Sequence, residues 1–191
     1  MIETQIVNQA RRQELGKKAG ISGAALPYFQ LEENTLLTDS TAIARHLIRE
    51  SPKAAMLLGD SPFMQAQVEQ MVALASASVL PAVQTIEATV YGTTINPEAH
   101  AMSLKSLKET CKVLNQLLTD KNWICGSSIT FADVHLFTSL APAFQICLDA
   151  GFRKAMPALA TWFEKMSKLP AIVGRLGHIR PCAKSLAPVK K

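Results

Sequence analysis

The residues best suited to bind a ligand lie near the N-terminus, in two short sequences. Leu26-Pro27 opens the first apolar segment, and Asp39-Ser40 opens a helical pattern. The residue before a cis-proline can offer its backbone to a peptide-like ligand, and the free N–H groups and dipole of a helix N-terminus favour a carboxylate. Together these residues predict a site for a peptide-like carboxylate. The alternative is that Asp39 or Ser40 serves only as the helix cap.

Thiol activation has no visible agent in this segment. It needs a side chain such as Tyr, Ser or Cys that can form a hydrogen bond with the thiol or lower its pKa. The residues before Pro27 include no Tyr and no Cys, and their only serine is Ser22. They are also too few for a complete strand-helix-strand-helix. We therefore predict a protein that is not an enzyme.

The cysteines and histidines do not suggest a metal or a disulfide framework. The four cysteines are widely spaced, and no pair of the four histidines has the spacing of metal ligands. The N-terminus lacks the pattern of a signal peptide, and no apolar run approaches 20 residues. These features predict reduced thiols, no metal, no membrane span and a cytoplasmic location.

The first part of the chain has an α+β pattern. Residues 9–18 read as a short polar helix, residues 25–31 and 35–38 as the strands of a hairpin, and residues 40–49 as a helix with one apolar face. Ser51-Pro-Lys then breaks the pattern. We expect a small N-terminal domain over residues 1–55.

The second part reads as entirely helical. Pro62 and Pro97 stand at first helical positions, and further helices are expected over residues 156–169 and 172–178. Pro81 should kink the first long helix because it lacks an N–H group. We expect an all-α domain over residues 60–180, followed by a basic linker or tail over residues 181–191.

A helix start signal stands in the middle of this second part. Thr130 can cap the helix, and Asp133 can reach back to the N–H group of Thr130, which makes a capping box. Gly126 precedes the cap, and the helix that follows is apolar on nearly every face. This combination resembles the central C-terminal helix of the glutathione-transferase fold.

A second run of residues is more specific. Leu148-Asp-x-x-Phe-Arg-Lys-x-x-Pro157, with Trp162-Phe163 downstream, resembles the glutathione-transferase-like domain of translation elongation factor 1 gamma, and related domains attached to some aminoacyl-tRNA synthetases. The resemblance covers residues 25–186. It implies a truncated thioredoxin-like part followed by the all-α domain of a glutathione transferase. Its fold-signature positions are Pro27, Gly126, Thr130, Asp133 and Trp162.

The resemblance also implies a function. Leu26, Asp39 and Ser40 match glutathione-site positions and would be vestigial, so no cofactor is expected other than weakly bound glutathione. The implied role is docking within the translation machinery, with elongation factor 1 subunits as partners and Arg45, Arg49 and Glu69 as the candidate partner surface. The alternatives are a scaffold of a multi-synthetase complex and a glutathione transferase with an unusual active site. Thr161 stands where such domains often carry an Arg that pairs with partner domains.

The charge is unevenly distributed along the chain. The net charge is +5, but residues 1–150 hold 11 Lys/Arg and 14 Asp/Glu, whereas residues 151–191 hold 9 Lys/Arg and 1 acidic residue. A basic C-terminal segment is compatible with a weak contact to tRNA or an acidic partner. The interpretation we favour is a solvated last helix followed by a linker.

Overall fold

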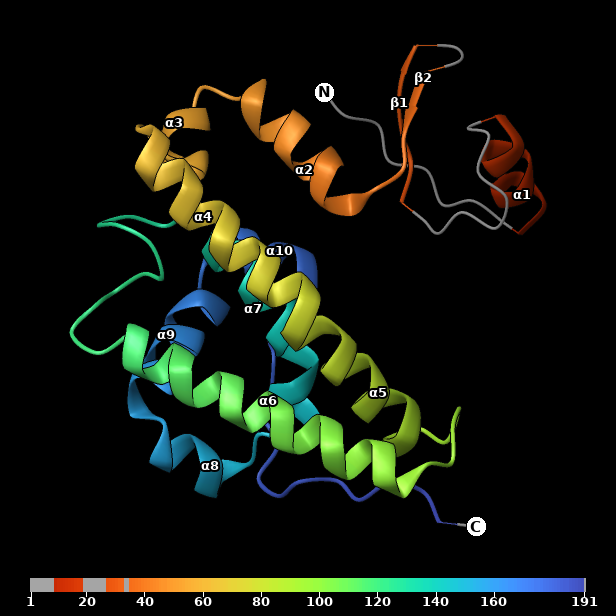
Figure 1. Cartoon of the computed structure of the whole chain (residues 1–191), viewed down its shortest axis with the longest axis vertical. Coiled ribbons are helices and arrows are strands. Elements are labelled where there is room, and N and C mark those ends of the chain that lie inside the picture. The colour runs from red at the N-terminus through yellow and green to blue at the C-terminus, as the bar shows by residue number, and fades with distance from the viewer. Residues whose placement is uncertain (1–8, 19–26, 33–34, 191) are drawn as a thin grey trace. The chain divides into compact units, whose positions relative to one another are not determined.

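The computed structural model describes residues 9–18, 27–32 and 35–190 (Figure 1). The chain divides into two compact units, an N-terminal unit of residues 1–54 and a helical unit of residues 55–191. The predicted fold class is confirmed, because a small part with a two-stranded sheet precedes an all-α domain.

The N-terminal unit contains a hairpin between two helices. Its elements are α1 (Gln9–Lys18), β1 (Phe29–Glu32), β2 (Thr35–Leu37) and α2 (Ser40–Arg49). The strands are antiparallel, and both helices have their predicted bounds. The strands are shorter than predicted. α3 (Ala54–Leu58), which the sequence did not predict, follows at the boundary of the units.

The predicted apolar face of α2 is directed into the N-terminal unit. Ile43 is 8% exposed, and the Phe29 and His46 rings lie 5.4 Å apart, which brings α2 against β1. Phe29 pairs with Leu37 across the hairpin. A few apolar side chains therefore hold this small unit together.

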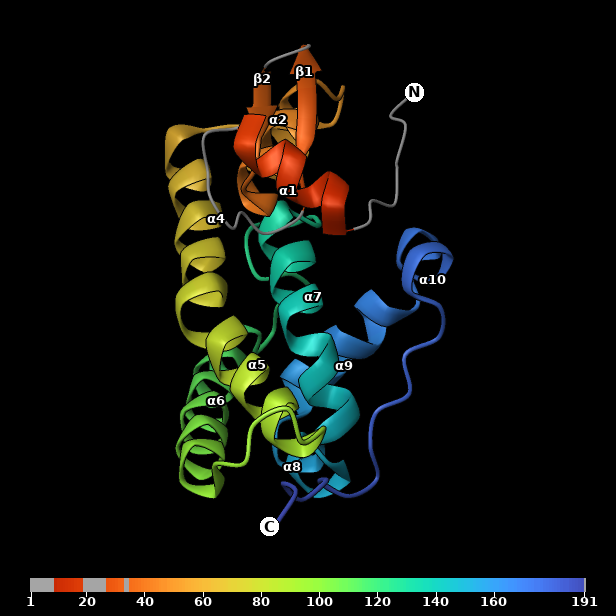
Figure 2. The same ribbon diagram turned by 90° about the vertical axis from the view of Figure 1, so that its right-hand side faces the viewer.

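The helical unit is a bundle around α7 (Figure 2). Its helices are α4 (Pro62–Leu74), α5 (Leu80–Val90), α6 (Pro97–Leu117), α7 (Phe131–Ile146), α8 (Ala150–Ala155), α9 (Pro157–Ser167) and α10 (Pro170–Leu176). α7 packs against α4, α5 and α9, and α6 packs along α5. Leu136, Phe137 and Leu140 on α7 are fully buried. The helix that was predicted to be apolar on nearly every face is thus the centre of the core.

The irregularity expected at Pro81 lies just before it. Residues Ala75–Val79 form a π-helical turn (η1) between α4 and α5, and the Leu80 N–H bonds the Ala75 carbonyl. Pro81 has no N–H group to continue the regular α-helical ladder, so the preceding turn is wider. The consequence is a change of turn type within a continuous helix.

That continuous helix, Pro62–Val90, is long and apolar enough to cross a membrane by length and composition, the single such helix among the described residues. It contains no uninterrupted apolar run near 20 residues, since polar residues such as Glu69 and Gln84 lie within it. It packs on α6 and α7, and Val68, Val79 and Ile86 are fully buried there. Its apolar character is that of a core helix.

The loop before α7 is closed by a buried carboxylate. Asp133 is 0% exposed. Its Oδ1 accepts hydrogen bonds from the Ile124 N–H (2.9 Å) and the Trp162 Nε1–H (2.9 Å), and its Oδ2 accepts from the Thr130 N–H (2.9 Å) and hydroxyl (3.0 Å). The capping box expected from the sequence is present. The same carboxylate also joins α7 to α9, because Trp162 lies on α9.

Gly126 meets two requirements in this loop. Its φ is +65°, a conformation that L side chains rarely adopt. A Cβ atom there would lie 2.6 Å from Cε of Met64, so α4 also approaches the loop closely.

The C-terminal segment, residues 178–190, is attached to the bundle by its backbone. The N–H groups of Cys182, Leu186 and Val189 donate to the carbonyls of Phe144 (2.8 Å), Ile146 (2.8 Å) and Thr89 (3.0 Å). The prediction of a linker from residue 181 did not anticipate these bonds. Lys184 and Lys190 are exposed on this segment.

Asp133→Asn should destabilise the helical unit by about 3–5 kcal/mol, because an amide cannot accept four hydrogen bonds and buried donors lose their partner. Trp162→Phe, which removes one donor, should cost about 1–3 kcal/mol. Urea unfolding followed by circular dichroism measures both.

The matched control is Trp123→Phe, which also removes an indole N–H, but one without a hydrogen-bond partner among the described residues. It should cost less than about 1 kcal/mol. A smaller effect of Asp133→Asn than of Trp162→Phe would contradict the role given to the carboxylate.

Candidate functional site

The predicted ligand site at α2 is occupied by its own cap. Asp39 accepts a hydrogen bond from the Ala42 N–H at 2.7 Å, and both Asp39 and Ser40 are exposed. The carboxylate therefore satisfies one of the free N–H groups and adds negative charge where an anionic ligand would bind. Capping, one of the two roles foreseen for Asp39, is the role that the structure shows.

The other half of that predicted site is only partly described. Leu26 lies outside the described residues, and Pro27 is exposed, two residues before β1. The structure brings only Asp39 and Ser40 together, as sequence neighbours. The assignment of the three glutathione-site positions is thus still a prediction.

The thiols are unsuited to nucleophilic chemistry near neutral pH. Burial raises the pKa of Cys111 and Cys147 to about 12, and burial together with the negative charge of Asp133 raises that of Cys125 to about 11. Burial also raises the pKa of the half-buried Cys182. Because the thiolate is the reactive form, all four side chains stay protonated and weakly reactive.

Two histidines make internal hydrogen bonds. His135 on α7 makes a hydrogen bond with the Ser76 hydroxyl at 2.9 Å. His100 was not singled out, yet it is 6% exposed and bonds the Thr89 hydroxyl at 2.7 Å. Burial lowers the pKa of His100, which favours the neutral ring. Among the described residues, no group of three or more His, Cys, Asp or Glu could hold a metal ion.

The candidate partner surface falls on both units. Arg45 is half-buried and Arg49 is exposed on α2, whereas Glu69 is exposed on α4. Arg45 and Arg49 are therefore a surface of the N-terminal unit, and Glu69 belongs to the helical unit. Phe63, 74% exposed, adds an apolar group to α4.

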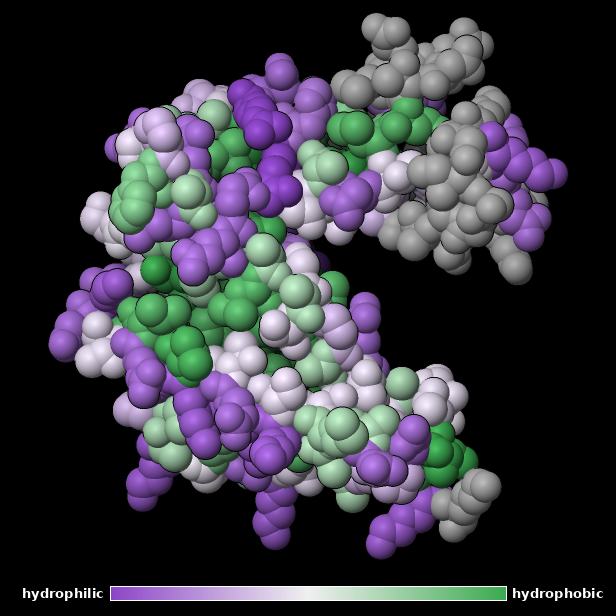
Figure 3. Space-filling model, in the orientation of Figure 1, coloured by the Kyte–Doolittle hydropathy of each residue, from purple (hydrophilic) through white to green (hydrophobic). Residues whose placement is uncertain are grey.

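Figure 3 shows two further features of the helical unit. Hydrophobic residues gather between α4 and the C-terminal end of α6. Val113 and Leu117, near the end of α6, are 50% and 39% exposed. Hydrophilic residues gather over α6 and α8. Lys108 on α6 lies 5.7 Å from the ring centre of Phe152 on α8, so the two helices lie side by side. Exposed lysines stand on both of them, Lys112 on α6 and Lys154 on α8, and we call this surface the basic face.

A pocket of about 400 Å³, which sequence reasoning missed, lies in the helical unit. Side chains of α7, α9 and the C-terminal segment form its walls, and Arg153 on α8 also contributes. Its residues are far apart in the sequence, so no local motif could have indicated it.

Comparisons with known proteins agree with this architecture. Residues 76–170 match the model of the glutathione S-transferase C-terminal domain family. The solved glutathione-transferase-like domain of elongation factor 1-gamma from Saccharomyces cerevisiae has a TM-score of 0.82 at 18% identity, over 95% of this chain and 84% of that one. This chain contains a glutathione-transferase-like domain. The resemblance to the elongation factor 1 gamma domain, stated from the sequence, is confirmed.

Proteins that are similar in sequence also include elongation factor 1-gamma. Elongation factor 1-gamma of Danio rerio is 28% identical over 160 residues, which are 83% of this chain and 35% of that protein. This chain thus spans about a third of the length of that relative. Enzymes are similar as well: a class Gtt2 glutathione S-transferase of Vibrio parahaemolyticus has a TM-score of 0.70 at 19% identity, over 93% of this chain and 84% of that one.

The raised pKa values predict slow alkylation of the native protein. At pH 8 a thiol with a pKa near 12 is ionised to only about one part in ten thousand, against roughly a quarter for a free cysteine. Cys111 and Cys147 should therefore react with iodoacetamide at least about a thousandfold more slowly than free cysteine, and Cys182 should react first. Peptide mapping by mass spectrometry over time measures each rate.

The same labelling in guanidinium chloride is the control, since all four thiols should then react alike. Rapid native labelling of Cys111 or Cys147 at pH 8 would show that these thiols are accessible and ionised.

Proposed function

We propose that this chain is a non-catalytic docking module of the translation machinery, which holds nucleotide-exchange subunits of elongation factor 1 together in the cytosol. The likeness to the elongation factor 1 gamma domain carries this proposal, over 83% of the chain in sequence and 95% in structure. The chemistry of the described residues supports it, because Asp39 caps a helix and the thiols are protonated.

The docking would rely on rigid helix faces. In the helical unit, Asp133 and the buried side chains of α7 fix the positions of the helices, so a partner that contacts α4 meets a surface that needs little ordering on binding. The exposed side of α2 offers Arg49 beside the half-buried Arg45, and α4 offers Glu69 with Phe63. Charges on such surfaces select partners and their orientation.

The combined variant Arg45→Glu, Arg49→Glu and Glu69→Lys should weaken this docking at least about tenfold, because reversed charges repel a complementary surface. The measurement is a tagged pull-down from native cytosolic lysate at moderate salt, read by quantitative mass spectrometry. Recovery of the exchange subunits should fall.

The control variant is Lys105→Glu, Glu109→Lys and Lys112→Glu, which makes the same change in net charge on exposed positions of α6. Its recovery should equal that of the parent. Undiminished recovery with the first variant would reject the assigned surface.

The same experiment distinguishes the alternatives. Recovery of aminoacyl-tRNA synthetases in place of exchange subunits would favour a scaffold of a multi-synthetase complex. A glutathione titration tests the remaining alternative, a glutathione transferase. Binding of glutathione at micromolar concentration would favour the transferase, whereas millimolar binding or no binding would favour the docking role.

A weak RNA contact is a second candidate, favoured by the basic face over α6 and α8. Lys112 and Lys154 are exposed on these helices. Lys184 lies close to α8, because the Ala150 N–H contacts the Ala183 carbonyl at 3.4 Å. Lysines gathered in this way suit a phosphate backbone.

Replacing Lys112, Lys154 and Lys184 with alanine should therefore weaken tRNA binding and reduce its salt dependence. The slope of log K against log salt should fall by roughly two to three, one for each lost phosphate contact. Fluorescence anisotropy with labelled tRNA at several salt concentrations measures it.

The control replaces the exposed Lys17, Lys53 and Lys121 with alanine and should leave the slope unchanged. Equal slopes for all three proteins would remove the basic face as an RNA site. Substitution is preferred to deletion of residues 180–191, because the backbone of that segment is bonded to the bundle.

A further inference from the structure

The pocket in the helical unit has a rigid apolar floor. Phe144 on α7 and Phe163 on α9 stack with their ring centres 3.6 Å apart and their planes 2° from parallel. Both rings are almost completely buried, so they form a fixed base under the pocket. Ile179 and Pro181 add apolar surface from the C-terminal segment. The apolar walls of this pocket are suited to an aromatic or branched aliphatic group.

One wall of the pocket carries a held guanidinium group. Nη1 of Arg153 donates to the Leu148 carbonyl at 2.6 Å and to the Cys182 carbonyl at 2.8 Å. Arg153 is half-buried and lines the pocket, and its guanidinium group also interacts with the Cys182 side chain. These bonds fix the group before any ligand arrives, and a fixed guanidinium edge suits a carboxylate.

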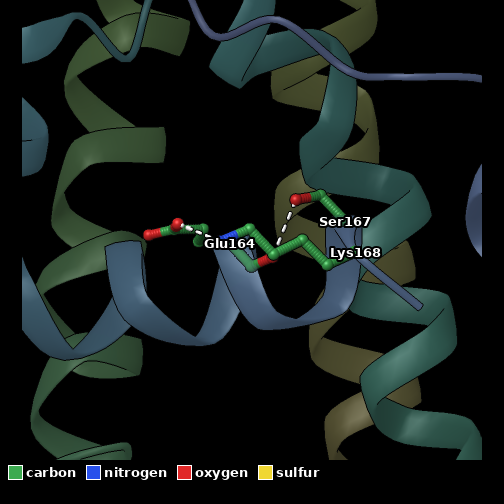
Figure 4. Close-up of polar contacts among 3 residues, drawn as sticks. All are labelled: Glu164, Ser167 and Lys168. Atoms are coloured by element: carbon green, nitrogen blue, oxygen red, sulfur yellow. Dashed lines mark hydrogen bonds and ion pairs between the residues drawn. The ribbon is translucent and has the colours of Figure 1, made fainter.

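The rim adds to this preference for an anion. Lys168 and His178 line the pocket, and Glu164 is the only acidic side chain among its lining residues. Lys168 Nζ contacts the Glu164 carboxylate at 2.5 Å, and the Ser167 hydroxyl donates to the Glu164 carbonyl at 2.8 Å (Figure 4). Because Lys168 offsets Glu164, Arg153 contributes an uncompensated positive charge.

We infer that this pocket binds a small organic carboxylate with an aromatic or branched apolar body. The carboxylate is held by the guanidinium group of Arg153, and the apolar body lies against the floor and the C-terminal segment. The volume of about 400 Å³ lies within the usual range of small-molecule sites. This site is independent of the proposed docking role, because it uses none of the residues assigned to partner surfaces.

The test uses 3-phenylpropionate as the probe and its neutral amide, 3-phenylpropanamide, as the matched ligand. Both are titrated into the isotope-labelled full chain at pH 7 and followed by two-dimensional NMR. The carboxylate should bind at least about tenfold more tightly than the amide, because a charge-assisted hydrogen bond distinguishes them. The chemical-shift changes should concentrate in α9 and residues 178–181.

Three variants locate the site. Ala160→Leu places a larger side chain in the pocket and should abolish binding. Arg153→Lys keeps the charge without the planar edge and should weaken binding of the carboxylate about tenfold, with little effect on the amide. Thr161→Leu, a change of similar size at an exposed position of the same helix, should leave binding unchanged.

Equal affinity for the acid and the amide would overturn the assignment to Arg153. Shift changes centred elsewhere, or no binding of the acid up to about 10 mM, would overturn the site itself.

Discussion

The helical unit depends on one buried carboxylate. A charged group that is removed from water is tolerated only when donors replace its hydration, and Asp133 has four of them. They come from the loop before α7, from the Thr130 cap and from Trp162 on α9. A single side chain thereby fixes the start of the central helix and the helix that packs beside it. The surfaces that the bundle offers to partners, and the pocket beside α9, depend on this arrangement.

The sequence predicted the local half of this arrangement and missed the rest. Thr130 and Asp133 are three residues apart, so their contact follows from helix geometry. The Trp162 bond joins residues 29 positions apart and follows from tertiary packing. For the same reason Pro81 indicated an irregular helix, while its position and type became visible only as a π turn over Ala75–Val79. Proline at the first helical position indicated the starts of α4 and α6, whereas α3 and α8 were missed because each is under two turns long.

The candidate sites show the same difference between what a local sequence predicts and what only tertiary packing determines. Asp39 was identified as both a cap and a ligand position, because one short sequence serves either role, and only the geometry shows the bond to the Ala42 N–H. The pocket combines residues from Phe144 to Pro181 and requires the C-terminal segment to lie across the bundle. Composition suggested a linker there, since proline, alanine and lysine carry no apolar periodicity. Backbone hydrogen bonds, which any sequence can make, hold the segment in place.

Several reactive side chains of the described residues are buried, and this burial limits the chemistry that they can do. Burial stabilises the neutral thiols and the neutral form of His100, and the hydrogen bonds of His135 and Asp133 are made within the bundle. Side chains that are buried and hydrogen-bonded within the bundle make the fold more rigid, and they are poorly placed to transfer protons or attack a substrate. The charged and apolar side chains that remain exposed on α2, α4, α6 and α9 are then the groups that can contact a partner or ligand. Because the interior is rigid, binding orders few further groups and therefore costs little entropy.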